Sequence, residues 1–187
     1  MFLRENDVGR RIAPHLESRQ TLLDFGAGTG FISRWLKDKV GIAPTLTDVV
    51  EYENRDKSLP FIRQRNPLRV PVADASFDVV MLLFVFHHMD EWTDQEVLLD
   101  EAVRIARRRL IIMEDTPESR IDLRLNMLWD RVLNWRHGVP TPFTFRSAEK
   151  WLGLFKSRDL SIAYADTYRA LWPTLKSYRN SIFVLDL

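Results

Sequence analysis

The segment "LLDFGAGTG" at residues 22–30 places three glycines at alternate positions directly after an apolar run that carries a carboxylate. Glycine is favoured where the backbone turns left-handed or approaches a ligand closely. In an open parallel sheet, a glycine-rich turn after the first strand contacts a cofactor beyond the carboxyl ends of the strands. Gly26, Gly28 and Gly30 are placed for this role. A tight strand-to-helix turn without a ligand is the alternative.

The spacing of these glycines distinguishes between nucleotide-binding motifs. The dinucleotide motif G-x-G-x-x-G needs glycine at position 31, where the sequence has Phe31, and no G-K-[ST] follows as a phosphate loop requires. Asp48 lies twenty residues beyond Gly28 at the end of the next strand candidate. A carboxylate there can accept both ribose hydroxyls, although it could also cap a helix or a solvated turn. Together these features predict a site for a nucleoside-bearing cofactor.

Strands and helices alternate along the chain and would position this loop. Apolar residues at helical spacing predict helices at 7–17, 31–40, 90–109, 121–136 and 147–158. Short apolar runs predict strands at 21–25, 44–48, 59–65, 77–84, 110–115, 160–165 and 181–187. The run at 77–84 is continuously apolar, which is typical of a central parallel strand. The alternation favours a doubly wound α/β fold.

Composition limits the classes of function. A length of 187 residues suits one domain, and 27 basic against 26 acidic residues leave no global field for a polyanion or a membrane surface. The absence of cysteine excludes disulfides, thiolate metal sites and a cysteine nucleophile. The longest apolar run, 79–86, is far shorter than a membrane helix, and the N-terminal segment does not resemble a signal peptide. We therefore expect a soluble cytoplasmic protein.

Two longer segments extend the pattern: "VPVADASFDVVMLLFVFHHMD" at 70–90 and "EAVRIARRRLIIMED" at 101–115. With the glycine loop and Asp48, they resemble the class I S-adenosylmethionine-dependent methyltransferases, especially the methyltransferase type 11-like small-molecule subgroup. The resemblance covers most of the chain. It implies a mostly parallel, seven-stranded Rossmann-like sheet with helices on both faces and one methyltransferase domain over 1–187. It also implies S-adenosylmethionine as the cofactor and S-adenosylhomocysteine as the product.

The resemblance assigns a cofactor role to individual residues. Asp24 would orient the loop and the amino group of the cofactor, Asp48 would bind the ribose diol, and Val49 would pack on adenine. The remaining cofactor residues are the loop and the end of the fourth strand: Gly26, Ala27, Gly28, Thr29, Gly30, Leu83 and Phe84.

The adenine position departs from the family pattern. Asn66 stands where the family has an aspartate, and its amide oxygen can still accept a hydrogen bond from the adenine amino group. Pro67 has no amide hydrogen, so the backbone donor would come from Leu68. Asp74 is assigned to a turn, because "ADAS" has the composition of one.

Two histidines are the candidate catalytic residues. His87 and His88 follow the fourth strand, where the acceptor should meet the cofactor, and a neutral imidazole can remove a proton near neutral pH. His88 is the preferred base. The alternative is that the pair only hydrogen-bonds the backbone at a helix entrance. A metal site is disfavoured, because adjacent side chains diverge and no third ligand has suitable spacing.

Residues 116–146 form the expected acceptor-side insertion or lid, since "WRHGVPTPFTF" is a constrained loop rich in aromatic residues. Trp135, His137 and Phe143 are the candidate acceptor contacts and would suit a planar or apolar small molecule. Trp129 could line the same pocket or belong to the buried face of a helix.

The "RIARRR" run at 104–109 is interpreted as the basic C-terminal turn of a helix rather than a nucleic-acid patch. Strand four also lacks the Asn/Asp-Pro-Pro-aromatic motif of base-amino methyltransferases. The sequence thus predicts in-line methyl transfer to a small molecule, with neither nucleic acid nor a membrane as partner and the oligomeric state open. An RNA or protein methyltransferase that needs a partner, or a non-catalytic cofactor-binding subunit, are the alternatives.

Overall fold

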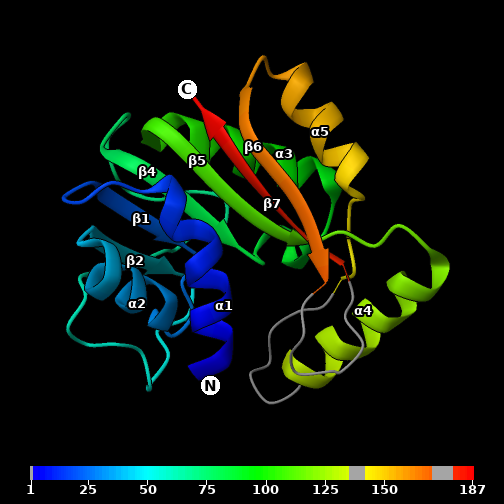
Figure 1. Ribbon diagram of the computed structural model, residues 1–187, viewed down its shortest axis with the longest axis horizontal. Helices are drawn as coiled ribbons and strands as arrows, with labels where there is room; N and C mark the ends of the chain where they lie inside the picture. Colours follow the sequence, from blue (N-terminus) through cyan, green and yellow to red (C-terminus); the bar gives the residue numbers. More distant parts are fainter. Residues whose placement is uncertain (1, 135–141, 170–178) are drawn as a thin grey trace.

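A seven-stranded sheet organises the computed structural model, which describes residues 2–134, 142–169 and 179–187 (Figure 1). The strand order is β3-β2-β1-β4-β5-β7-β6. All neighbouring strands are parallel except β7, which runs antiparallel to β5 and β6. The bounds are β1 (Thr21–Phe25), β2 (Ala43–Asp48), β3 (Phe61–Arg63), β4 (Phe77–Leu83), β5 (Ala106–Asp115), β6 (Ser161–Arg169) and β7 (Arg179–Asp186). The predicted mostly parallel sheet is confirmed, with β4 at its centre.

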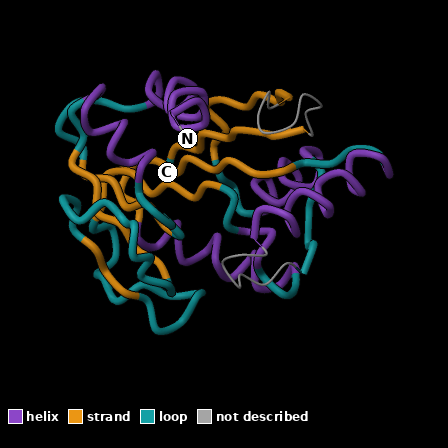
Figure 2. The backbone as a smooth tube through the Cα atoms, turned by 90° about the horizontal axis from the view of Figure 1, so that it is seen from below, coloured by secondary structure: helices purple, strands orange, loops and turns teal. Residues whose placement is uncertain are grey.

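Helices cover both faces of the sheet, as Figures 1 and 2 show. The helices are α1 (Phe2–Ile12), α2 (Phe31–Val40), α3 (Trp92–Ile105), α4 (Arg120–Asn134) and α5 (Ala148–Ser157), with short 3-10 turns η1 (Ala13–His15) and η2 (Phe86–His88). One buried cluster joins α1 and α2 to the sheet through Ile12 and Leu36, and a second joins α3 and α5 through Leu99 and Phe155. No helix among the described residues is long and apolar enough to cross a membrane.

Two predicted helix boundaries are wrong. The first helix begins at Phe2 and ends at Ile12, and Pro14 lies at the start of the following 3-10 turn. Only Arg104 and Ile105 of the "RIARRR" run end a helix, because α3 ends at Ile105 and the following arginines lie in β5. Pairing of β5 with β4, together with ion pairs such as Arg107 to Asp78 at 2.8 Å, favours the extended backbone.

The register of the strands brings the candidate site together. Phe25 lies opposite Thr47 on β2 and opposite Leu82 on β4. The next position along each strand therefore places Gly26, Asp48 and Leu83 at one edge of the sheet, since parallel strands end on the same side. This is the edge at which α/β sheets bind their ligands.

Candidate functional site

The glycine loop leaves β1 as a left-handed turn tied to β2. Gly26, Gly28 and Gly30 have φ angles of 71°, 54° and 75°. The amides of Gly26 and Ala27 donate to the Thr47 carbonyl at 2.9 and 3.1 Å. The loop is therefore held in place by the neighbouring strand before any ligand binds.

The space around the loop tests whether it fits a cofactor. A Cβ atom on Gly30 would lie 2.4 Å from Leu46 Cδ1. Glycine is therefore needed at this position so that Leu46 can pack against the loop. A Cβ atom on Gly28 would meet nothing within 4 Å, although its amide is 2.9 Å from Asp48 Oδ2. The backbone at Gly28 thus faces open space beside a carboxylate, which fits the close approach of a ligand.

A pair of alanine variants separates these two roles. We expect Gly30→Ala to destabilise the protein through the Leu46 clash, with ligand-independent loss of stability in urea unfolding. Gly28→Ala should cost only about 1 kcal/mol of stability for its left-handed backbone, yet weaken S-adenosylmethionine binding about tenfold or more. Titration calorimetry measures the affinity, and normal binding by Gly28→Ala would contradict a ligand at this position.

Asp48 is buried at the end of β2 and oriented by two backbone amides. Its Oδ2 accepts from Gly28 N at 2.9 Å and its Oδ1 accepts from Val50 N at 3.0 Å. A carboxylate has about four acceptor positions, so capacity remains for a ribose diol. The hydrogen bond from Val50 N also makes Asp48 a turn-capping residue, which was the alternative role. Asp48 can cap this turn and bind a ribose diol at the same time. Val49 is 40% exposed beside it, which leaves an apolar surface for adenine.

Asp24 lies deeper, beneath the glycine loop. Its Oδ2 accepts a hydrogen bond from Ser33 Oγ at 2.7 Å. Burial raises the pKa of the Asp24 carboxyl to about 7, and the negative charge of Asp48 acts in the same direction. The side chain is therefore poised to change charge near neutral pH. Sequence reasoning missed Ser33, whose only signal was a small polar residue on the first turn after the loop.

The adenine-side residues Asn66 and Leu68 are bonded to each other. The amide of Leu68 donates to Asn66 Oδ1 at 2.8 Å, within a turn closed by Arg69 N donating to the Asn66 carbonyl at 3.1 Å. Asn66 is exposed, and its Oδ1 keeps a second lone pair. The donor expected from Leu68 is already used in this arrangement, so contact with adenine through both groups requires the turn to open.

The two histidines have different environments. The His87 side chain is buried, and its Nδ1 is 2.7 Å from Glu114 Oε2. Glu114 Oε1 accepts from Phe86 N at 2.7 Å. His87 therefore has a clear structural contact with β5, whereas His88 is partly exposed beside it, with ring centroids 4.2 Å apart. The hydrogen bond of His87 gives this residue a structural role, although its partner is a side chain and not the backbone. His88 is the more exposed histidine of the two.

Glu114 is the residue that sequence reasoning missed in this region, although "LIIMED" showed carboxylates at the end of its strand. Its side chain is only 1% exposed. We expect Glu114→Ala to lower the free energy of unfolding by roughly 2–5 kcal/mol, because it leaves two buried N–H groups without an acceptor. Urea unfolding measures this loss. Glu118→Ala is the control, because Glu118 is an exposed glutamate four residues later in the chain. A loss equal to that of the control would contradict the role of Glu114 as an anchor.

The C-terminal end of the expected lid, residues 142–146, is fixed to η2. Thr144 Oγ1 donates to the Met89 carbonyl at 2.6 Å, and Gln95 Nε2 donates to the carbonyls of Phe86 and Thr144 at 3.0 and 2.7 Å. Arg146 Nε donates to Gln95 Oε1 at 2.6 Å. These polar residues of α3 and 142–146 were not predicted, because nothing in the local pattern pairs them.

The structure describes some of the aromatic residues expected on the acceptor side. Phe145 stacks on His87 with ring centroids 5.2 Å apart, and Phe143 lies 6.4 Å from Phe145. Phe143 thus lies near the histidine turn. Trp135 and His137 lie outside the described residues. Asp74 lies in a turn, as predicted, and its carboxylate contacts Arg104.

Within the described residues no group of three or more histidine or acidic side chains could hold a metal ion. A glycine loop after β1, an acid at the end of β2 and this strand order together define the class I methyltransferase fold.

Comparisons with known proteins agree with that class. The family model described as "Methyltransferase domain" matches residues 23–112. Residues 23–112 thus match the methyltransferase domain family, and the sheet has the fold of the class I S-adenosylmethionine-dependent methyltransferases. A search of curated protein sequences finds no match.

Solved structures share the fold at low sequence identity. A Methanosarcina mazei S-adenosylmethionine-dependent methyltransferase is 17% identical with a TM-score of 0.72, and the match covers 94% of this chain and 96% of that one. The methyltransferase component of a complex with the Haloferax volcanii Trm112 activator is 18% identical with a TM-score of 0.67, covering 98% and 93%. The Burkholderia thailandensis 1,6-didemethyltoxoflavin-N1-methyltransferase is 15% identical with a TM-score of 0.69, covering 98% and 78%.

Proposed function

We propose that this protein transfers the methyl group of S-adenosylmethionine to a small-molecule acceptor. The observation that carries the proposal is the open space at Gly28 beside the oriented Asp48 carboxylate. The cofactor supplies an activated methyl group on a sulfonium. Asp48 binds the ribose diol, Asp24 attracts the amino group, and the loop backbone lies against the body of the cofactor.

On the acceptor side, the main task of the protein is to position the acceptor. In-line displacement depends mainly on alignment of the acceptor and exclusion of water. Residues 142–146 are bonded to η2 through Thr144. This segment would close the site over His88 and would bring its own Phe143 to the acceptor. His88 removes a proton where the acceptor must lose one, and Trp135 and His137 complete the acceptor contacts. The Burkholderia thailandensis structure, solved with bound 1,6-didemethyltoxoflavin, supports a small acceptor by its fold similarity.

The second candidate is a methyltransferase that acts on RNA or protein with the help of a partner subunit. It is favoured by the fold similarity to the methyltransferase bound to a Trm112 activator. A third, a cofactor-binding subunit without catalysis, is favoured by the bonded Asn66–Leu68 turn at the adenine side.

Titration with S-adenosylmethionine followed by a methyl-release assay distinguishes the candidates. We expect micromolar binding and turnover with pooled metabolites. Turnover with RNA alone would favour the partner-dependent enzyme, and binding without turnover would favour the subunit. Absence of binding would overturn the proposal.

A further inference from the structure

A groove lined by four arginines lies beside the expected adenine position and shares Asn66 with it. Its volume is about 690 Å³, and its lining residues are Arg63, Arg65, Asn66, Arg69, Val70, Pro71, Val72 and Arg104. The connection from β3 to β4 carries no helix. Parallel strands are usually joined through a helix. Its absence leaves the groove open.

The arginines of the groove have unequal partners. Arg104 is fully engaged, because it bonds Glu101, Asp74 and the carbonyls of Val70 and Val72. Arg69 has only a contact of 3.6 Å with Glu101.

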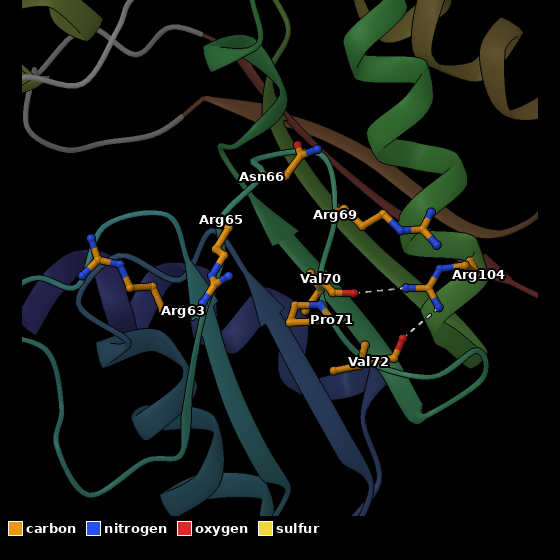
Figure 3. Close-up of a pocket in the computed structure, with 8 residues that line it drawn as sticks. All are labelled: Arg63, Arg65, Asn66, Arg69, Val70, Pro71, Val72 and Arg104. Atoms are coloured by element: carbon orange, nitrogen blue, oxygen red, sulfur yellow. Dashed lines mark hydrogen bonds between the residues drawn. The ribbon is translucent and has the colours of Figure 1, made fainter.

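Arg63 and Arg65 have no acidic partner among the described residues and are exposed. Figure 3 shows Arg65 extending along the groove, Arg69 and Arg104 at the wall formed with α3, and Arg63 directed outward. Arg65, which has no acidic partner among the described residues, and Arg69, whose ion pair with Glu101 is 3.6 Å long, are therefore the arginines of the groove that can meet a ligand.

The charge of the groove is unbalanced within a nearly neutral protein. Two of the four arginines, Arg69 and Arg104, contact the carboxylates of Glu101 and Asp74, so the groove carries two more positive than negative charges. The whole chain carries a net charge of only +1. The excess is therefore a local feature of this groove.

We propose that this groove binds a small ligand that carries two or more phosphoryl groups. Guanidinium forks match phosphate oxygens in geometry and charge. The groove lies within the size range of small-molecule sites, and Val70, Pro71 and Val72 offer an apolar wall for the body of the ligand. Asn66 Nδ2 is a further donor at the rim, since its Oδ1 accepts from Leu68. The inference is independent of methyl transfer.

Titration calorimetry with sodium pyrophosphate, in chloride buffer without cofactor, tests the proposal. We expect a dissociation constant below about 1 mM for the parent protein. The double variant Arg65→Gln and Arg69→Gln should bind at least about tenfold more weakly. The control Arg108→Gln removes one positive charge from an exposed arginine of β5 and should bind within about twofold of the parent. Circular dichroism verifies that each variant is folded.

Three results would overturn the proposal. Binding that falls equally in the Arg108→Gln control would show nonspecific attraction. Competition between pyrophosphate and S-adenosylhomocysteine would place the anion in the cofactor site. Failure of pyrophosphate to bind, with tight binding of a labelled single-stranded RNA, would assign the groove to a nucleic-acid backbone instead. Loss of S-adenosylmethionine binding alone leaves the pyrophosphate result unchanged, so the two proposals fail separately.

Discussion

Replacing Asp48 with alanine is expected to weaken S-adenosylmethionine binding about tenfold to a hundredfold. Hydrogen bonds to a charged group contribute about 1.5–3 kcal/mol, and each 1.4 kcal/mol corresponds to about tenfold in affinity. The carboxylate is oriented by Gly28 and Val50 before the ligand arrives, so little ordering is needed on binding. Titration calorimetry with the cofactor measures the change.

The same variant should lose some stability, since two backbone amides lose their acceptor. Urea unfolding separates this loss from the loss of affinity. Glu51→Ala is the matched control, because Glu51 is an exposed acid three residues away that contacts only Arg55 and Lys57 among the interactions described. Unchanged affinity in Asp48→Ala would remove Asp48 from the cofactor site.

The second large effect concerns Asp24→Asn, which we expect to stabilise the free protein at alkaline pH. Burial raises the pKa of Asp24 from 3.8 to about 7. The folded protein therefore holds a proton that the unfolded chain has released, and the stability from Asp24 is complete below pH 3.8 and lost as the pH rises through 7. At pH 8 the charged side chain costs on the order of 4 kcal/mol. The asparagine variant avoids this cost.

Unfolding in urea at pH 4, 6 and 8 measures the effect. The free energy of unfolding of the variant should increase relative to that of the parent as the pH rises from 4 to 7. Above pH 7 the difference between the two should stay constant. Asp38→Asn, on the exposed face of α2, should show no such gain. A difference between Asp24→Asn and the parent that does not vary with pH would contradict the raised pKa.

Cofactor binding should change in the opposite direction. Between pH 5.5 and 7.5 the affinity of the parent rises, because Asp24 becomes charged and attracts the ammonium group of the cofactor. The variant should bind more weakly and with little dependence on pH. S-adenosylhomocysteine, which lacks the sulfonium charge, should show the same pH dependence. A flat profile for the parent protein would exclude contact between Asp24 and the amino group.

Much of the geometry around the glycine loop could be predicted from the sequence, because its signals are local. A glycine that needs a positive φ angle and an acid that ends the next strand are each encoded within a few residues. The parallel register then brings Gly26 and Asp48 together without further information. The alternation of strands and helices likewise determined the sheet and its two helix layers.

Only the tertiary structure decided what the side chains contact. His87 follows β4 like His88, but Glu114 of the neighbouring strand holds it in the protein interior. The arginines after Ile105 could end a helix, and pairing with β4 places them in a strand.

The sequence by itself therefore determined the alternation of strands and helices and the glycine loop, because periodicity and glycine conformation are local properties of the chain. It did not determine the Glu114 anchor, the Gln95–Thr144 contact or the arginine groove. Each of these joins residues far apart in sequence, and burial and charge at such contacts depend on packing that no local pattern records.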